Sequence, residues 1–201
     1  MVSMGWAGKH DPRVSGQARW CERAMIGDEP FAVLLPDVLV RAGPSCLAQM
    51  VQAYDDTGGN IIAVEQVAPE DVNKYGVIDP IDREGNRIRM RGMVEKPAVD
   101  KAPSNLAITG RYILQGTIFK YLEDQAAGAG GEIQLTDAMA RLMQHQDFHA
   151  VEYEGMSYDC GDKLGYLRAT LSFALHDPEL GAAARKVAEA VLKAEGQANR
   201  A

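Results

Sequence analysis

The sequence predicts an α/β fold with a parallel sheet, and three neighbouring segments carry that prediction. Residues 31–35 (FAVLL) form an unbroken apolar run that stops at Pro36, as expected for a strand buried on both faces. Residues 46–54 repeat apolar side chains on one helical face, and residues 60–67 (NIIAVEQV) form a second apolar strand. Strand, helix and strand at this spacing indicate a βαβ unit, which favours parallel strands.

The rest of the chain alternates between strand and helix patterns. The polar segment 82–86 (DREGN) between two strand-like runs predicts a hairpin, and the second run alternates arginines with apolar residues, as a half-exposed strand does. Residues 128–132 are expected to form a loop and residues 158–161 a tight turn. The remaining predicted elements are strands at 75–81, 87–94, 106–114 and 148–153, and helices at 118–122, 133–143, 163–175 and 178–194.

Bulk properties narrow the class of protein. The 201 residues suit one domain with an appendage, and a hydrophobic content of 46% can supply a sizeable core. A net charge of −7 argues against nucleic acid or an anionic membrane as a partner, although it leaves room for a nucleotide ligand. No apolar stretch approaches the roughly 18 residues of a membrane span, and the start of the chain lacks a signal-peptide core.

Three cysteines and an atypical first segment complete this outline. Cys21, Cys46 and Cys160 are an odd number without close pairing, so we expect reduced thiols and a cytoplasmic protein. Residues 1–26 show neither helical nor strand periodicity, and we expect a poorly ordered lead there. The main domain is then expected over residues 27–177 and a C-terminal helix over 178–201.

Asp37 is the first candidate for chemistry. It follows the apolar run 31–35 directly, and ligands of open α/β sheets bind beyond the carboxyl ends of the strands. A metal or phosphate ligand is therefore one interpretation, and a turn or helix cap is the other. The segment alone does not decide between them.

The ends of the hairpin carry a second set of candidates. Glu95-Lys96-Pro97 ends the alternating strand, because a proline cannot donate to the ladder. The Glu95 carboxylate could accept hydrogen bonds from sugar hydroxyls, and the adjacent Lys96 ammonium could bind a phosphate. Gly76 at the start of the partner strand could let a ligand approach the backbone. The alternatives are ordinary solvated charges at a strand end and a turn glycine.

Asp159 is the third candidate. It precedes the helix at 163–175, where either Asp159 or Asp162 could be the N-cap. Asp162 fits the cap better, which leaves Asp159 as a possible second metal ligand. No nucleophile motif of the Ser/His/Asp or Cys/His kind accompanies these residues, so we expect no covalent catalysis.

In their order along the chain these motifs resemble the bacterial UTP–glucose-1-phosphate uridylyltransferase family. The resemblance covers residues 27 to 177, and the segments that carry it are 27–38 (GDEPFAVLLPDV), 74–79 (KYGVID), 93–97 (MVEKP), 103–114 (PSNLAITGRYIL), 130–139 (GGEIQLTDAM) and 158–167 (YDCGDKLGYL). It implies the nucleotide-diphosphosugar transferase fold, a Rossmann-like mixed sheet with helices on both faces. The implied reaction joins UTP and glucose 1-phosphate into UDP-glucose and pyrophosphate with Mg²⁺.

The resemblance also implies a role for each candidate. Asp37 and Asp159 would hold Mg²⁺, with Asp37 and Lys96 as the catalytic residues. Glu95 would bind glucose hydroxyls, Lys96 the sugar phosphate, and Gly76 would let glucose lie against the backbone, whereas Asn105 lies in a matching motif with a less defined role. Because the sugar phosphate is already a nucleophile near neutral pH, positioning and charge neutralisation suffice and no general base is needed. Members of the family are commonly dimers or tetramers, so we expect a homo-oligomer.

One departure from the family pattern is large. The family opens with a strand, a G-x-G-T-R loop and a P-K-E-M-L segment, and neither motif occurs in this sequence. We therefore expect a chain that lacks the first elements of the sheet and turns over weakly or not at all. The alternatives are an impaired fragment that only binds sugar phosphate or a partner subunit, and a related thymidylyl or adenylyl transferase.

Overall fold

The computed structural model describes residues 26–123 and 135–198, and side chains only to residue 194 in the last helix. Two compact units make up the chain: Met1–Leu35 with Pro44–Glu154, and Pro36–Gly43 with Gly155–Ala201. The expected lead before Ile26 and the expected loop at 128–132 lie outside the described residues. No described helix is long and apolar enough to cross a membrane.

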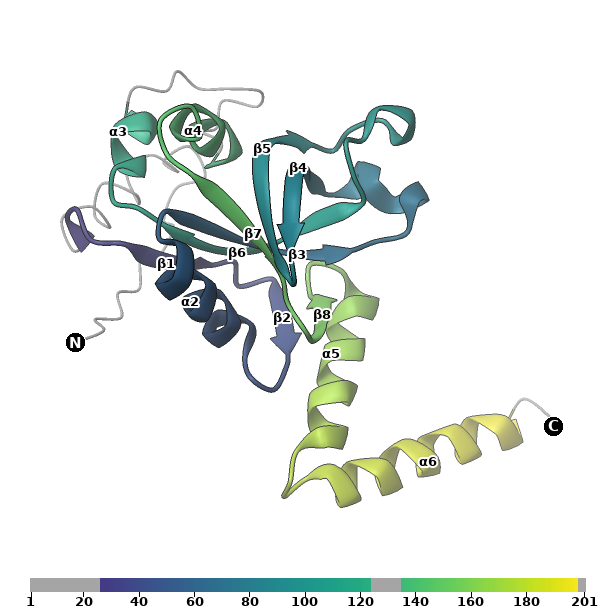
Figure 1. Cartoon of the computed structure of the whole chain (residues 1–201). Coiled ribbons are helices and arrows are strands. Elements are labelled where there is room, and N and C mark those ends of the chain that lie inside the picture. Colours follow the sequence, from purple (N-terminus) through teal and green to yellow (C-terminus); the bar gives the residue numbers. More distant parts are fainter. Residues whose placement is uncertain (1–25, 124–134, 199–201) are drawn as a thin grey trace. The chain divides into compact units, whose positions relative to one another are not determined.

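The first unit is built on a six-stranded mixed sheet (Figure 1). Its strand order is β1-β6-β3-β7-β5-β4. Only β3 and β7 pair in parallel, and the other pairs are antiparallel. The strands are β1 (Phe31–Leu34), β3 (Asn60–Gln66), β4 (Gly76–Glu84), β5 (Arg87–Glu95), β6 (Leu106–Leu114) and β7 (Phe148–Glu152).

The predicted α/β class with a mixed sheet is confirmed, but the expectation of a parallel sheet from the first βαβ unit is wrong. β1 and β3 do run in the same direction, yet β6 lies between them and pairs antiparallel with both. This strand comes from far along the chain, so local spacing could not reveal it. The predicted burial of the first strand on both faces is also wrong: β1 alternates, and Leu34 is 50% exposed, because β1 is an edge strand within the described sheet.

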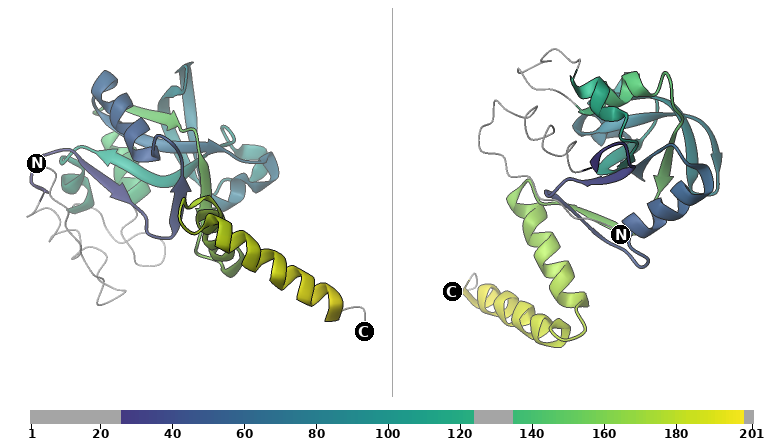
Figure 2. Two further views of the ribbon diagram at one scale, coloured as in Figure 1. Left: turned by 90° about the horizontal axis from the view of Figure 1, so that it is seen from below. Right: turned by 90° about the vertical axis from the view of Figure 1, so that its left-hand side faces the viewer.

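Helices cover both faces of this sheet (Figures 1 and 2). On one face lies α2 (Cys46–Thr57), which Ser45 caps by accepting a hydrogen bond from the Ala48 N–H at 3.2 Å. On the other face α3 (Ile118–Glu123) and α4 (Leu135–Leu142) cover the main core. That core joins Ile62, Val64, Ile78, Ile88, Met90, Leu114, Ile118, Phe119, Met139 and Phe148, among others.

The hairpin β4–β5 extends further than the sequence predicts. β4 continues to Glu84, so the turn consists of Gly85 and Asn86 alone, with Gly85 at φ 64°. Pro80 lies inside β4, and the register shifts on both sides of it, as expected where a residue without an N–H interrupts a ladder. At its open end β4 also pairs with β6, with Val77 opposite Ala107. Short 3₁₀ turns at Pro69–Lys74 (η1) and Val99–Lys101 (η2) flank the hairpin.

The second unit is a two-stranded ribbon with two helices. β2 (Val38–Arg41) pairs antiparallel with β8 (Met156–Asp159), followed by α5 (Lys163–His176) and α6 (Gly181–Ala198). Neither short strand was expected, and Tyr158 and Asp159 end a strand instead of belonging to a turn. Such four-residue strands are too short for a clear period-2 pattern, and Leu39 and Met156 in them are exposed.

Candidate functional site

Asp37 and Asp159 lie close together along the two-stranded ribbon of the second unit. Asp37 occupies the turn just before β2, and its backbone carbonyl accepts a hydrogen bond of 2.6 Å from the Cys160 N–H. In the ladder itself Val38 is paired with Asp159. The two predicted metal ligands are therefore one residue apart across the ribbon, and both are exposed.

The helix cap and Asp159 have separate roles, as the sequence suggests. Asp162 is the N-cap of α5: its Oδ1 accepts hydrogen bonds from the N–H groups of Leu164 at 2.7 Å and Gly165 at 2.9 Å. Asp159 accepts only a local bond, from the Gly161 N–H to Oδ1 at 2.8 Å. The Asp159 carboxylate therefore does not cap α5.

The donor set of the ribbon fits Mg²⁺. Mg²⁺ prefers oxygen ligands and commonly binds through one or two carboxylates, while substrate phosphates and water supply the rest. Asp37 and Asp159 offer two carboxylates, and no cluster of three or more His, Cys, Asp or Glu side chains suited to a metal occurs among the described residues. The chemistry of this pair suits a metal shared with a phosphate better than a closed, all-protein metal site.

The other predicted residues gather at the open end of the hairpin in the first unit. Gly76 is paired with Glu95 across β4 and β5. A Cβ on Gly76 would lie 2.9 Å from Glu95 Oε2 and 3.4 Å from Ile108 Cδ1. The missing side chain of Gly76 therefore lets the Glu95 carboxylate lie across the strand, which is a structural reason for glycine in addition to ligand access.

Lys96 has an unusual backbone. Its φ is 45°, and it is the only non-glycine residue with positive φ in the described part of the chain. Its N–H donates to the Tyr75 carbonyl at 3.0 Å, and the buried Pro97 follows. A left-handed conformation costs a non-glycine residue about 1–2 kcal/mol. Such strain is common at ligand-binding sites, and here it orients an exposed lysine.

Tyr112 in β6 is buried in the main core, and Glu95 is close enough to influence its hydroxyl electrostatically. Burial raises the pKa of Tyr112 to about 12, and the nearby Glu95 carboxylate adds to the rise. The phenol therefore stays neutral at physiological pH.

Asn105 is engaged within the fold. Its Nδ2 donates to the Val67 carbonyl at 3.1 Å, and the Val67 N–H donates back to the Asn105 carbonyl at 3.0 Å. These two bonds extend the pairing of β3 and β6 beyond the ladder. The side chain of Asn105 therefore has a structural role, and its predicted part in substrate binding stays a prediction.

Sequence reasoning missed a buried arginine. Arg111 in β6 is only 7% exposed, and its Nη1 donates to the carbonyls of Leu35 at 2.8 Å and Gly110 at 3.1 Å. Gly110 has φ 67° and lies against Leu35, where a Cβ would come within 2.7 Å of a side-chain carbon. The strand end that leads into Pro36 is thereby fixed. An arginine in the otherwise apolar run 106–114 was the available signal.

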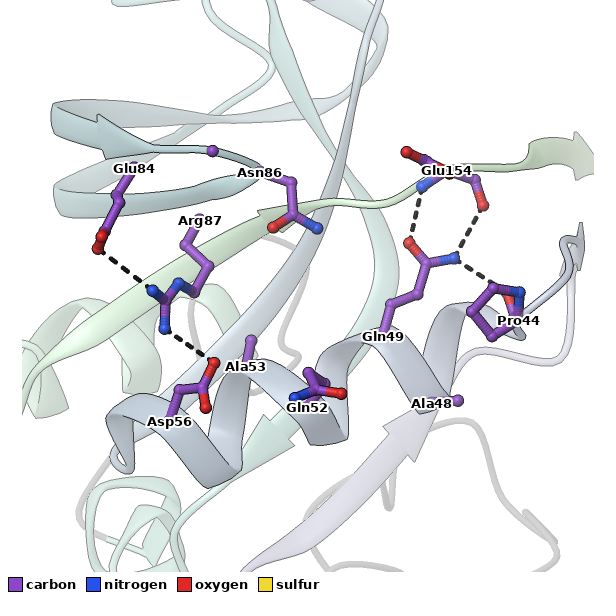
Figure 3. A pocket seen from close by; sticks show the side chains of 11 residues that line it. Pro44, Ala48, Gln49, Gln52, Ala53, Asp56, Glu84, Asn86, Arg87 and Glu154 are labelled. Carbon is purple, nitrogen blue, oxygen red and sulfur yellow. Dashed lines mark hydrogen bonds and ion pairs between the residues drawn. The ribbon is translucent and has the colours of Figure 1, made fainter.

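An open pocket of about 630 Å³ lies elsewhere in the first unit, between α2 and the hairpin turn (Figure 3). Gln49 is held there by both backbone groups of Glu154, at 2.8 and 2.9 Å, and by the Pro44 carbonyl. Arg87 pairs with Asp56 and Glu84. None of the predicted site residues lines this pocket, and its central polar groups already serve the fold.

The chain also matches a known protein family, described as Nucleotidyl transferase, over residues 3–174. The chain belongs to the nucleotidyl transferase family. The family match begins well before Gly27, where the resemblance in the sequence motifs begins. It includes both the hairpin end and the ribbon with its two aspartates.

Individual members of the nucleotidyl transferase family point to one branch. The chain is 51% identical over 170 residues to the UTP–glucose-1-phosphate uridylyltransferase of Bacillus subtilis (strain 168), covering 85% of this chain and 58% of that protein. Two solved structures from Acinetobacter baumannii are similar. A UDP-glucose pyrophosphorylase matches with a TM-score of 0.80 and 38% identity over 90% of this chain and 64% of its own. A UTP-bound form matches at 0.78 and 40%, over 88% and 62%.

These matches confirm the resemblance seen in the motifs and the predicted fold class. The names of these nucleotidyl transferases refer to UTP or UDP-glucose. They therefore do not favour the alternative of a thymidylyl or adenylyl transferase. The chain spans about 58% of the length of the curated relative.

Proposed function

We propose that this chain carries part of a UTP–glucose-1-phosphate uridylyltransferase, which forms UDP-glucose and pyrophosphate from UTP and glucose 1-phosphate. The observation that carries the proposal is the 51% identity to a relative of that name over a segment that contains every candidate site residue. The geometry of the hairpin end and of the ribbon supports it independently.

Two sets of residues, each described within its own unit, carry the proposed chemistry. Glu95 accepts hydrogen bonds from glucose hydroxyls while Gly76 leaves the backbone open to the ring. Lys96, aimed by its left-handed backbone, neutralises the sugar phosphate. Asp37 and Asp159 hold Mg²⁺, which when bound neutralises phosphate charge. Asn105 keeps this end of the sheet in register.

No residue of the chain needs to act as a general base. The phosphate of glucose 1-phosphate carries its negative charge before reaction, so the protein has only to position it and neutralise charge. Lys96 neutralises the charge that the sugar phosphate already carries, and the two aspartates serve as oxygen ligands and move no proton. The lack of a nucleophilic side chain among the candidates is consistent with this direct transfer.

A pyrophosphate-release assay tests the function. With UTP, glucose 1-phosphate and Mg²⁺ we expect UDP-glucose as the sugar nucleotide, and TTP or ATP in place of UTP should give less product. Because the G-x-G-T-R motif does not occur in the 201 residues, we expect turnover well below the ordinary range of about 1–1000 s⁻¹. Preference for TTP or ATP would contradict the assignment, and fast turnover would contradict the expected impairment.

The same family membership supports a homo-oligomer in the cytoplasm with no nucleic acid or membrane partner. α6 exposes Val187, Val191 and Leu192, with Leu192 74% exposed, which favours a helix that packs on a second copy. Light scattering of the purified chain should give at least twice the 21.8 kDa of one chain. A mass of one chain at micromolar concentration, or a membrane-bound fraction after cell lysis, would contradict this.

A further inference from the structure

Helix α5 touches Asp159 at a point where no side chain could fit. Gly165 lies in the first turn of α5, and a Cβ there would overlap the carbonyl oxygen of Asp159 and lie 2.9 Å from its carbonyl carbon. Glycine is a poor residue for a helix, so helix formation does not explain its presence at this position. Close approach of the helix to the backbone of Asp159 does explain it.

The segment around Asp159 is tied to the segment around Asp37. The Asp159 carboxylate accepts from the Gly161 N–H, and the Cys160 N–H donates to the Asp37 carbonyl. A displacement of the Asp159 backbone is therefore expected to move the Cys160 N–H, which is hydrogen-bonded to Asp37. The backbone of Asp37 is thus joined to the residue that follows Asp159.

A second group of contacts, centred on Ser172, also joins the ribbon to α5. Ser172 Oγ in α5 shares a hydrogen bond of 2.5 Å with the Tyr158 hydroxyl and accepts another from Arg41 Nε at 3.2 Å. Arg41 ends β2 and Tyr158 precedes Asp159 in β8, so both strands of the ribbon reach the helix. The Phe173 ring packs against Tyr158, with centroids 5.9 Å apart.

From these contacts we infer that α5 positions the aspartate pair, with Gly165 as the positioning residue for Asp159 and the Ser172 cluster as its second anchor. The inference rests on the proposed function only in treating Asp37 and Asp159 as metal ligands. Gly165 does not touch the metal or the substrate. It acts by letting the helix backbone lie against the residue that does.

The decisive variant is Gly165→Ala, with Gly43→Ala as the matched control. A Cβ on Gly43 meets nothing within 4 Å, and Gly43 belongs to the same unit. In Gly165→Ala the Asp159 carbonyl or the helix must move, so the Cys160 amide should exchange at least about tenfold faster and the Gly161 amide resonance should shift. Gly43→Ala should leave both signals unchanged. Unchanged signals in Gly165→Ala would overturn the inference whether or not the chain binds a metal.

A gentler pair of variants covers the case in which Gly165→Ala does not fold. Ser172→Ala and Tyr158→Phe remove hydroxyls at the second anchor and should accelerate exchange of the Cys160 amide by a smaller factor. Unaltered exchange in both would remove the Ser172 cluster from the inference.

Titration with Mn²⁺ separates this inference from the proposed function. If Asp37→Asn weakens Mn²⁺ binding and Gly165→Ala weakens it as well while Gly43→Ala does not, both ideas hold. If Asp37→Asn has no effect, the metal role fails, but the exchange data still decide whether α5 positions the pair. If Asp37→Asn weakens binding and Gly165→Ala does not, the positioning role is overturned.

Discussion

Lys96 has a strained backbone conformation that lowers stability and sets the direction of its side chain. Its φ of 45° is unfavourable for any residue with a Cβ, yet the Tyr75 carbonyl and the following proline fix the backbone there. A glycine at this position would relieve the strain without changing the chain path. A strained backbone at an exposed residue makes physical sense if the direction of its side chain matters.

We therefore expect Lys96→Gly to stabilise the fold and to impair binding. The free energy of unfolding should be about 1 kcal/mol higher in Lys96→Gly than in Lys96→Ala, because alanine keeps the strain. Both variants should lose affinity for glucose 1-phosphate, since both lack the ammonium. Urea unfolding and calorimetric titration measure the two effects. Equal stability of the two variants would mean that the backbone is not strained.

A second residue-scale prediction concerns alkaline pH. Burial raises the pKa of the Cys46 thiol from 9.0 to about 11, so the unfolded chain releases this proton at lower pH than the folded chain. The contribution to stability is therefore complete below pH 9 and is lost as the pH rises through 11. The thermal midpoint should therefore decrease as the pH is raised from 9.0 to about 11. Cys46→Ala should show a shallower fall, and an identical slope in both proteins would exclude the thiol as a cause.

The elements divide into those that the sequence could predict and those that it could not. β5 and β6 were predictable because a regular arginine alternation and a long apolar run are local patterns. The antiparallel position of β6 between β1 and β3 was not, because strand order depends on contacts far apart in the chain. β2 and β8 offer only four residues each, so their pairing becomes visible only in three dimensions.

The same division applies to the candidate site. Asp37 and the Glu95-Lys96 pair were predicted from their places at strand ends, and Asp159 from its place in a turn before a helix, which are local properties. Gly165 and Arg111 were missed because their roles arise from contacts with a backbone carbonyl elsewhere in the fold. A glycine in a helix and an arginine in an apolar strand do not by themselves predict which groups they contact.

At the scale of elements, the caps of α5 and α6 offer a matched pair. Asp162 caps α5, and Asp177 Oδ1 accepts from the N–H groups of Glu179 and Leu180 in the turn that leads into α6. Each substitution by alanine should cost about 1 kcal/mol of local stability. Only Asp162→Ala should also change the Gly161 amide resonance, because only that cap lies beside Asp159. A similar change in Asp177→Ala would show that the signal reports general loosening of the helices.

At the scale of the whole molecule, the two units have very different cores. Of the buried hydrophobic residues in the described chain, only Tyr158 and Ala169 belong to the unit of Pro36–Gly43 and Gly155–Ala201. α5 and α6 instead carry many exposed apolar side chains, among them Leu164, Tyr166, Leu167, Leu171, Val187, Val191 and Leu192. Buried apolar area supplies most of the folding free energy. The second unit, with two buried hydrophobic residues in its described part, therefore has little folding free energy of its own.

Local opening should therefore separate the two units in native-state hydrogen exchange. Amides of α5 should exchange at least about 100-fold faster than those of β3 and β6, because small cores open at lower free energy. Ala169→Gly should accelerate exchange in α5 alone, whereas Ile62→Val in the main core should lower protection throughout the first unit, by the equivalent of about 1 kcal/mol. One common exchange rate for α5 and β3 would show that the units unfold together. Because Asp37 and Asp159 both lie in the weaker unit, such opening would disrupt the proposed metal site while the hairpin end stays folded.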